Sequence, residues 1–186
     1  MIRGLLFDLD GTLVDTHQAN FEAYRRALAD CGVVLSHEAF MEVVGHQAMT
    51  FLPMLAPGLS QDEYRQITER KAVYYKEVIH LSVANTALIK FLDDAGGKNR
   101  TALVTSAKRG NAENVLQHHG LTDKFDLIIT SDDVATSKPS PEPYLLALEK
   151  LGLKPEEAIA FEDSAVGVQA AEAAGIAVVP IGNYTG

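Results

Sequence analysis

The sequence contains few of the residues that mark several classes of protein. It has 186 residues, of which one is cysteine and none is tryptophan. A single cysteine, Cys31, allows neither an intrachain disulfide nor a zinc cluster of several thiolates, which fits a reducing compartment. No apolar run reaches the roughly 20 residues that span a bilayer. Asp8 and Asp10 also interrupt the apolar start too early for a signal peptide. We therefore expect a cytoplasmic protein without a membrane partner.

Positive charge is also scarce. Sixteen Lys and Arg residues stand against 25 Asp and Glu residues, so the formal net charge is −9 at pH 7. A broad basic surface for nucleic acid is therefore not expected. An anionic ligand would have to be bound by a local group of residues rather than attracted by the charge of the whole protein. The chain is long enough for one buried core with a small inserted domain.

Five short apolar runs predict buried strands. They lack a clean alternation of apolar and polar residues, which is typical of strands that are covered on both faces. From residue 101 onward these runs alternate with helical patterns, so the fold class is α/β, with a parallel sheet and helices on both faces. The expected strands are residues 4–9, 101–105, 127–130, 158–161 and 176–181.

Residues 16–80 interrupt this rhythm with helical patterns alone. We expect them to form an inserted helical domain, while residues 1–15 and 81–186 form the α/β core. Asp15 is expected to cap the first inserted helix, and Ser36 is expected to cap a short second one. Residues 60–63 read Ser-Gln-Asp-Glu, which predicts a capping box at the start of a long helix.

The sharpest chemical signal is the sequence Asp-Leu-Asp-Gly-Thr at residues 8–12. Asp8 and Asp10 would point to opposite faces of a continuing strand, but Gly11 bends the chain at this point. Both carboxylates can then face the crevice beyond the carboxyl end of the strand, where open α/β sheets bind ligands. A polar turn without function is the alternative interpretation of this motif when it is taken alone.

Polar groups also follow three of the later strands. Thr105 and Ser106 end one strand before a helix, and a hydroxyl with free N–H groups suits an anion there. Lys138 precedes a proline-rich loop that fixes its direction. Glu162 and Asp163 end another strand and supply the oxygen ligands that Mg²⁺ prefers. The alternatives are simple helix caps for Thr105, Ser106 and Asp163, and a solvated loop lysine for Lys138.

The order and spacing of these four motifs resemble those of the haloacid dehalogenase superfamily, over essentially the whole chain. The inserted helices look like the small cap of the branch that contains β-phosphoglucomutase and phosphoglycolate phosphatase. Gly167, five residues after Glu162, also matches the β-phosphoglucomutase branch. The resemblance implies a Rossmann-like parallel sheet with an inserted α-helical cap.

The resemblance also implies roles for the motif residues. Asp8 would be the nucleophile that forms an aspartyl-phosphate, and Asp10 would protonate the leaving group and then deprotonate water. Mg²⁺ would be the cofactor, bound by Asp8, the backbone carbonyl of Asp10 and Asp163, with Glu162 as a nearby or water-mediated ligand. The residues implied for binding the phosphoryl group are Gly11, Thr105, Ser106 and Lys138.

The resemblance leaves several functions open. Dehalogenase members lack the metal and the second acid, so Asp10 with the acidic pair at 162–163 favours phosphoryl transfer. Where the mutase branch has a cap histidine and a cap arginine, this chain has Asn20 and Ala48, and the loss of arginine removes an anchor for a second phosphate. Lys71 matches a cap lysine of that branch, and Asn20, His46 and Lys71 are the candidate cap contacts.

We therefore expect an Mg²⁺-dependent phosphatase that hydrolyses a small phosphorylated metabolite of the sugar phosphate or phosphoglycolate type. A phosphosugar mutase is the alternative, and a binding protein without catalysis is less favoured because the nucleophile, the acid and the lysine are all present. A monomer is expected, with a dimer as the alternative.

Overall fold

The computed structural model describes residues 1–44, 48–182 and 184. The chain forms two compact units, one made of Met1–Asp15 with Val83–Gly186 and the other of Thr16–Ser82. Among the described residues, no helix combines the length and the apolar character needed to cross a membrane.

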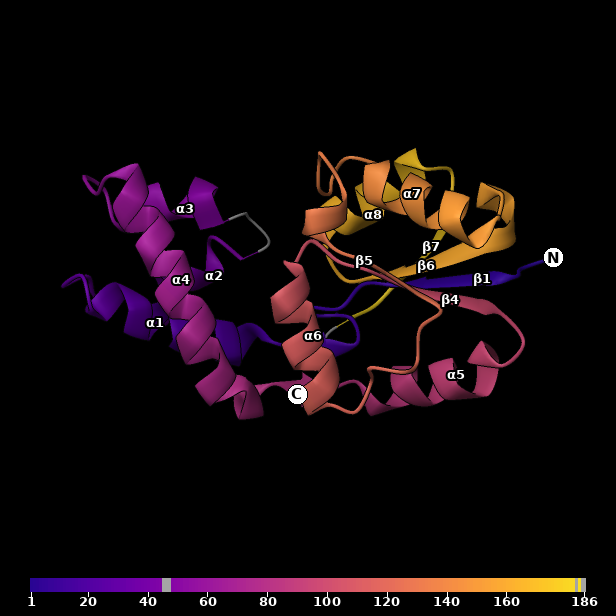
Figure 1. Ribbon diagram of the computed structural model, residues 1–186, viewed down its shortest axis with the longest axis horizontal. Coiled ribbons are helices and arrows are strands. Elements are labelled where there is room, and N and C mark those ends of the chain that lie inside the picture. Colours follow the sequence, from indigo (N-terminus) through magenta and orange to yellow (C-terminus); the bar gives the residue numbers. More distant parts are fainter. Residues whose placement is uncertain (45–47, 183, 185–186) are drawn as a thin grey trace. The chain divides into compact units, whose positions relative to one another are not determined.

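A five-stranded parallel sheet forms the centre of the first unit (Figure 1). Its strand order is β5-β4-β1-β6-β7, so the first strand of the chain lies in the middle. All five predicted strands are confirmed, with ends that differ by one or two residues. The strands are β1 (Gly4–Phe7), β4 (Arg100–Val104), β5 (Leu127–Ile129), β6 (Ala158–Glu162) and β7 (Ala177–Pro180).

Helices cover both faces of this sheet, as predicted. Figure 1 shows α7 (Glu142–Leu151) and α8 (Ala165–Ala173) on one face, and α5 (Thr86–Gly96) and α6 (Arg109–His118) on the other. The α5 helix is not among the helices that the sequence analysis predicts. The α/β fold class with a doubly covered parallel sheet is therefore confirmed.

The central strand explains why apolar runs without alternation form this sheet. Leu6 packs into the core cluster that contains Tyr144 of α7. The ring of its neighbour Phe7 stacks on Phe161 of β6 with centroids 4.6 Å apart, and Phe161 in turn contacts Phe91 of α5 at 5.5 Å. Successive side chains of a strand point to opposite faces, and here each face is buried by helices, so every position favours an apolar residue.

A short antiparallel pair closes the first unit. Strand β2 (Val14–Asp15) pairs with β3 (Val83–Ala84), so Asp15 lies opposite Val83. The prediction that Asp15 caps the next helix is therefore wrong. Since the pairing with β3 keeps Asp15 in a strand, the N-cap residue of α1 is Thr16. Thr16 makes no side-chain capping bond.

The second unit is helical. Its helices in the described ranges are α1 (His17–Ala29), α2 (His37–Met41), α3 (Ala48–Leu55) and α4 (Gln61–Val78), followed by a 3₁₀ turn, Ile79–Leu81. Ser36 caps α2, and Ser60 with Glu63 forms the predicted capping box of α4. The buried Tyr64 of α4 donates its hydroxyl to the carbonyl of Ala56 at 2.9 Å.

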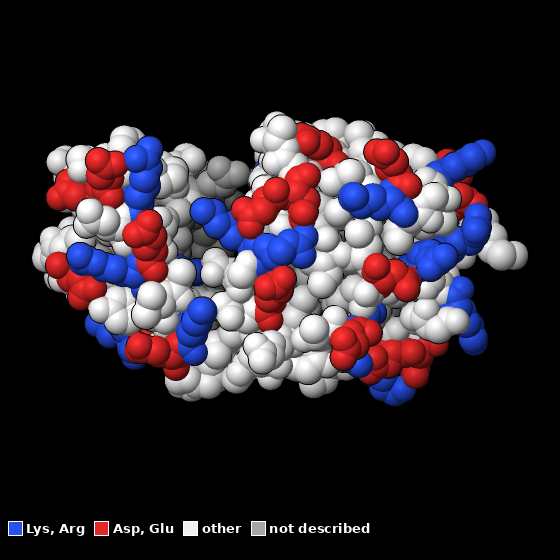
Figure 2. Space-filling view, viewed as in Figure 1, with Lys and Arg blue, Asp and Glu red and all other residues white. Residues whose placement is uncertain are grey.

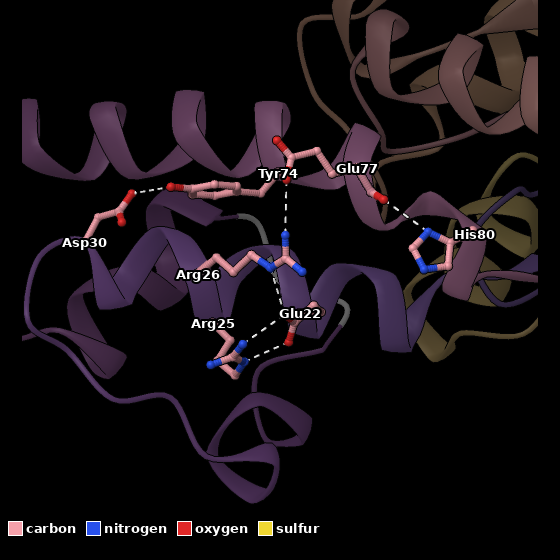
Figure 3. Close-up of polar contacts among 7 residues, drawn as sticks. All are labelled: Glu22, Arg25, Arg26, Asp30, Tyr74, Glu77 and His80. Carbon is pink, nitrogen blue, oxygen red and sulfur yellow. Dashed lines mark hydrogen bonds and ion pairs between the residues drawn. The ribbon is translucent and has the colours of Figure 1, made fainter.

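Exposed ion pairs lie on α1, and one of them joins α1 to α4 (Figure 3). Arg26 donates to Glu22 at 2.8 Å and to Glu77 at 3.1 Å, and Arg25 donates to Glu22 at 2.7 Å. The hydrogen bonds from Arg25 and Arg26 lower the pKa of Glu22 to about 2. The helices are thus linked by charges at their surface in addition to their apolar core.

Candidate active site

The polar motifs meet at one edge of the sheet. Asp8 follows β1 and Thr105 follows β4, and Glu162 is the last residue of β6. The three strands are parallel, and in their register Phe7 pairs with Phe161. Asp8, the next residue, donates its backbone N–H to the Phe161 carbonyl at 3.0 Å. These side chains therefore gather at the carboxyl edge, where α/β sheets bind ligands.

Lys138 reaches this edge from the loop before α7. Its side chain is 3% exposed, and its ammonium group donates to Asp8 Oδ1 at 2.7 Å, to the Val104 carbonyl at 2.8 Å and to Glu162 Oε1. An ammonium group has three donors, and all three are used. The alternative of a solvated loop lysine is therefore excluded.

Burial and charge act against each other in this group. Burial lowers the pKa of Lys138, but the charges of Asp8 and Glu162 outweigh it and hold that pKa above its ordinary value. Burial raises the pKa of Glu162, and Asp8 raises it further, while Lys138 opposes both. Lys138 is therefore positively charged at neutral pH.

Asp163 is placed by the turn that follows Asp8. The buried Thr12 donates its hydroxyl to Asp163 Oδ1 at 2.9 Å, and Asn85 holds the Thr12 carbonyl at 3.1 Å. Gly11 has a φ of 90°, and a Cβ at this position would overlap the Asp163 carboxylate. Ser164, rather than Asp163, caps α8, so Asp163 is not a simple helix cap.

Three carboxylates of this edge form a group that suits a divalent cation. Asp8, Glu162 and Asp163 each offer an oxygen atom within 4.8 Å of the others. Glu162 is fully buried, and its Oε2 has no hydrogen-bond partner among the described residues. Buried carboxylates are costly without compensating charge, and hard oxygen donors are the ligands of Mg²⁺. The donor set therefore fits Mg²⁺.

The remaining motif residues lie around this group. The backbone of Asp10 bridges to Val14 next to the Gly11 turn, and the Asp10 side chain is not among the three clustered carboxylates. Thr105 is buried, and its hydroxyl oxygen accepts from the N–H of Ala107 at 3.0 Å. Ser106 is exposed. The Thr105 hydroxyl and the exposed Ser106 thus lie between the end of β4 and the start of α6, where the sequence analysis expects an anion to bind.

The candidate cap contacts belong to the second unit. Lys71 is buried, with its Nζ 4.2 Å from the ring centroid of Tyr75 and 5.2 Å from that of Tyr24. Asn20 donates to the hydroxyl of Thr16 at 3.1 Å. His46 lies outside the described residues.

Several residues at this edge are absent from the sequence analysis. Tyr144 donates its hydroxyl to Glu162 at 2.5 Å, although its sequence pattern marks only an apolar helix face. Tyr184 has a buried hydroxyl without a partner among the described residues, and burial together with the charges of Asp15 and Asp163 raises its pKa. No signal at Tyr184 points to this group, whereas Thr12 lies inside the first motif and could have been included.

Comparisons with known proteins agree with this geometry. The sequence model of a family described as haloacid dehalogenase-like hydrolase matches residues 5–181. The phosphorylated carbohydrates phosphatase of Thermotoga maritima is 32% identical over 180 residues, which cover 94% of this chain and 82% of that relative.

Two solved structures share the fold over nearly the whole chain. CbbY from Rhodobacter sphaeroides, in complex with phosphate, matches with a TM-score of 0.87 and 28% identity, over 100% of this chain and 89% of that one. The β-phosphoglucomutase of Clostridium difficile matches with a TM-score of 0.83 and 28% identity, over 99% and 86%.

Proposed function

Because the chain belongs to the haloacid dehalogenase-like hydrolase family, we propose that it is an Mg²⁺-dependent phosphatase with Asp8 as nucleophile. The observation that carries the proposal is the buried contact of 2.7 Å between Lys138 Nζ and Asp8 Oδ1, beside the carboxylates of Glu162 and Asp163. A nucleophilic carboxylate must be fixed in direction, and Lys138 supplies that constraint.

The first step of the proposed reaction is attack of an Asp8 oxygen on phosphorus, with loss of the alcohol. Asp10, two residues further along the chain, would donate a proton to the leaving oxygen. General acid catalysis of this kind typically raises the rate of such a step about 10²–10⁴-fold. Water would then attack the phosphorus of the aspartyl-phosphate, with Asp10 accepting its proton, and Asp8 would be released. Dividing one displacement into two steps in this way is the usual advantage of a covalent intermediate.

The negative charge of this site must be balanced before a phosphate dianion approaches. Lys138 contributes one positive charge, and its contacts with Asp8 and Glu162 direct it to the edge of the sheet. Mg²⁺ bound by Asp8, the Asp10 carbonyl and Asp163, with Glu162 close by, would supply the charge that brings carboxylate and phosphate together. Thr105 and the N–H of Ser106 would hold phosphoryl oxygens, with Gly11 close by.

The proposed substrate is a small phosphorylated metabolite of the sugar phosphate type, as the name of the Thermotoga relative suggests. Figure 2 shows acidic and basic side chains interspersed over both units on the face drawn. A protein with a net charge of −9 would bind such a phosphate through Lys138 and the cation rather than through a general field.

Phosphoryl transfer within a phosphosugar is the second candidate, favoured by the likeness to β-phosphoglucomutase and by the buried Lys71. Asn20 and Ala48 stand where that branch is expected to have histidine and arginine. Without the guanidinium group, a second phosphate loses a bidentate anchor, and we therefore place hydrolysis first.

Release of phosphate from p-nitrophenyl phosphate, with Mg²⁺ and with chelator, tests the proposal. We expect turnover that requires Mg²⁺ and falls by about 10⁴-fold or more in Asp8→Asn, since removing a nucleophile typically costs this much or more. The matched control is Asp94→Asn, which alters an exposed aspartate paired with Lys90 and should retain native turnover. Native activity in Asp8→Asn would reject Asp8 as the nucleophile.

A further inference from the structure

Tyr144 makes a contact that sets it apart from Tyr64, a buried tyrosine of the second unit. It is the third residue of α7, fully buried in the core beneath the sheet edge. Its hydroxyl donates to Glu162 Oε1 at 2.5 Å. The buried Tyr64 of the second unit donates instead to a backbone carbonyl, that of Ala56. Tyr144 therefore bonds a carboxylate of the candidate active site rather than satisfying the backbone.

Tyr144 also contacts Lys138. The Lys138 Nζ lies 5.1 Å from the centroid of the Tyr144 ring, where the ring face attracts a cation. The same Nζ donates to Glu162 Oε1, the oxygen that accepts the Tyr144 hydroxyl. One side chain thus touches both members of the buried ion pair, the acid through its hydroxyl and the lysine through its ring.

These contacts fix the orientation of the Glu162 carboxylate. Oε1 accepts from two donors, whereas Oε2 is buried and has no hydrogen-bond partner among the described residues. Removing the Tyr144 hydroxyl leaves one donor on Oε1, and the terminal torsion of a glutamate is broad and roughly two-fold. The hydroxyl therefore helps to hold the plane of the carboxylate, so that one oxygen meets the two donors of the protein and the other is left for another ligand.

We infer that Tyr144 is a positioning residue that sets the divalent-cation affinity of the site, by holding Glu162 Oε1 beside Lys138 and leaving Oε2 available. The inference rests on the proposed function, in which Glu162 lies close to Mg²⁺. Groups that orient metal ligands through hydrogen bonds typically change metal affinity or activity by about 10–100-fold when they are removed. Tyr144 belongs to this class because it touches the ligand and neither the substrate nor the reacting atoms.

The test is the Mg²⁺ affinity of Tyr144→Phe, which keeps the ring over Lys138 and removes only the hydroxyl. Calorimetric titration of the full, chelator-treated chain with Mg²⁺ alone should give a Kd raised about 10-fold or more. Tyr64→Phe is the matched control, since it loses a buried hydroxyl in the other unit and should keep the native Kd. A native or tighter Mg²⁺ affinity in Tyr144→Phe overturns the inference.

A double-mutant cycle tests whether Tyr144 acts through Glu162. In a Glu162→Gln background the change Tyr144→Phe should raise the Kd no further, and an undiminished further loss would contradict this route. If Tyr144→Phe does not fold, a crystal structure of the native chain with Mg²⁺ decides. The Tyr144 hydroxyl should remain within hydrogen-bond distance of Glu162, and a Glu162 side chain turned away from it overturns the inference.

Turnover separates this inference from the proposed function. Native protein that binds Mg²⁺ but hydrolyses no phosphate ester would reject the phosphatase, while the raised Kd of Tyr144→Phe would still stand. Native turnover with an unaltered Kd in Tyr144→Phe would reject the role of Tyr144 alone.

Discussion

Each unit of this protein contains a buried lysine, and the two lysines have different surroundings. Lys138 in the α/β unit donates to Asp8, to Glu162 and to a backbone carbonyl. Lys71 in the helical unit lies over the rings of two tyrosines, the nearer being Tyr75. Both are less than a tenth exposed. Burial alone therefore does not distinguish the lysine of the proposed active site from another buried lysine.

The neighbours that the structure gives for the two ammonium groups differ: carboxylates for Lys138 and tyrosine rings for Lys71. Charge-assisted hydrogen bonds to carboxylates are strong and directional, whereas attraction to a ring face is weaker, about 0.5–2 kcal/mol. Lys138 is accordingly held in one direction between two acids. Lys71 has two tyrosine rings beside its ammonium group, and its contact with a substrate is part of the proposal.

Among the variants that compare the two units, Lys138→Met should produce the largest loss of stability and of turnover. Asp8 and Glu162 would then be buried without their common cation, and breaking a buried ion pair typically costs about 3–5 kcal/mol. We expect urea unfolding in Mg²⁺-free buffer to show a loss of that order, together with a fall in turnover of about 10²–10³-fold. A stability close to the native value would contradict the view that Lys138 compensates both acids.

Gly167→Ala tests whether the position of Glu162 beside Lys138 matters, and it removes no charge. Gly167 lies in the first turn of α8, and a Cβ there would overlap the Glu162 carboxylate. Moving Glu162 away from Lys138 should lower turnover about 10–100-fold. Gly110→Ala is the matched control in α6, since a Cβ at Gly110 meets nothing within 4 Å, and it should keep native turnover. Equal rates in the two variants would show that the position of Glu162 does not matter.

Lys71→Met is the counterpart of Lys138→Met in the second unit. The loss of cation–π contacts with Tyr24 and Tyr75 should lower the unfolding free energy by about 1 kcal/mol. Hydrolysis of p-nitrophenyl phosphate should remain close to native, because in the proposal Lys71 contacts the sugar moiety and not the phosphoryl group. A loss of p-nitrophenyl phosphate turnover as large as that of Lys138→Met would remove the distinction between the two lysines.

Removing a charge from the exposed ion pairs of Figure 3 should have the smallest effect on stability. The folded pKa of Glu22 is about 2 against 4.5 unfolded, so its contribution is present above pH 4.5 and is lost as pH falls toward 2. Its partners Arg25 and Arg26 are 47% and 37% exposed, which limits that contribution to about 1 kcal/mol.

Glu22→Gln tests this sign. The variant should be less stable than the native chain in urea at neutral pH, and the difference should shrink as the pH falls below 4.5. Glu69→Gln, an exposed change on α4, serves as control and should show no such trend. A difference that grows on acidification would mean that Glu22 is not held in its charged form by the arginines.

Much of the fold could be predicted because its signals are local. Apolar runs without alternation mark the strands of a doubly covered sheet, and the capping box at Ser60 and Glu63 marks the start of α4. The cap at Asp15 was predicted wrongly because its conformation depends on pairing with Val83, far along the chain. The α5 helix was not predicted, although Asn85 caps it by accepting from the N–H of Leu88.

In the candidate site, too, local features could be predicted from the sequence and contacts between distant segments could not. The end of a parallel strand is a local feature, so Asp8 and Glu162 could be expected at one edge. Their exact partners depend on packing between elements, which no spacing in the sequence records. Tyr144 reaches Glu162 from α7 across the face of the sheet, and Thr12 orients Asp163 from another loop. The contacts by which one residue positions another are therefore found only when the fold is known, even where the residue itself, like Thr12, lies in a recognisable motif.

The central claim is that the Asp8 carboxylate is phosphorylated during turnover. Mass spectrometry of peptides from a reaction that is quenched rapidly with acid, with Mg²⁺ and substrate in excess, tests this directly. We predict that the peptide containing Asp8 carries a phosphoryl group in the native chain, and that the modification is absent from Asp8→Asn. An unmodified Asp8 at every time point, while phosphate is released, would contradict the account.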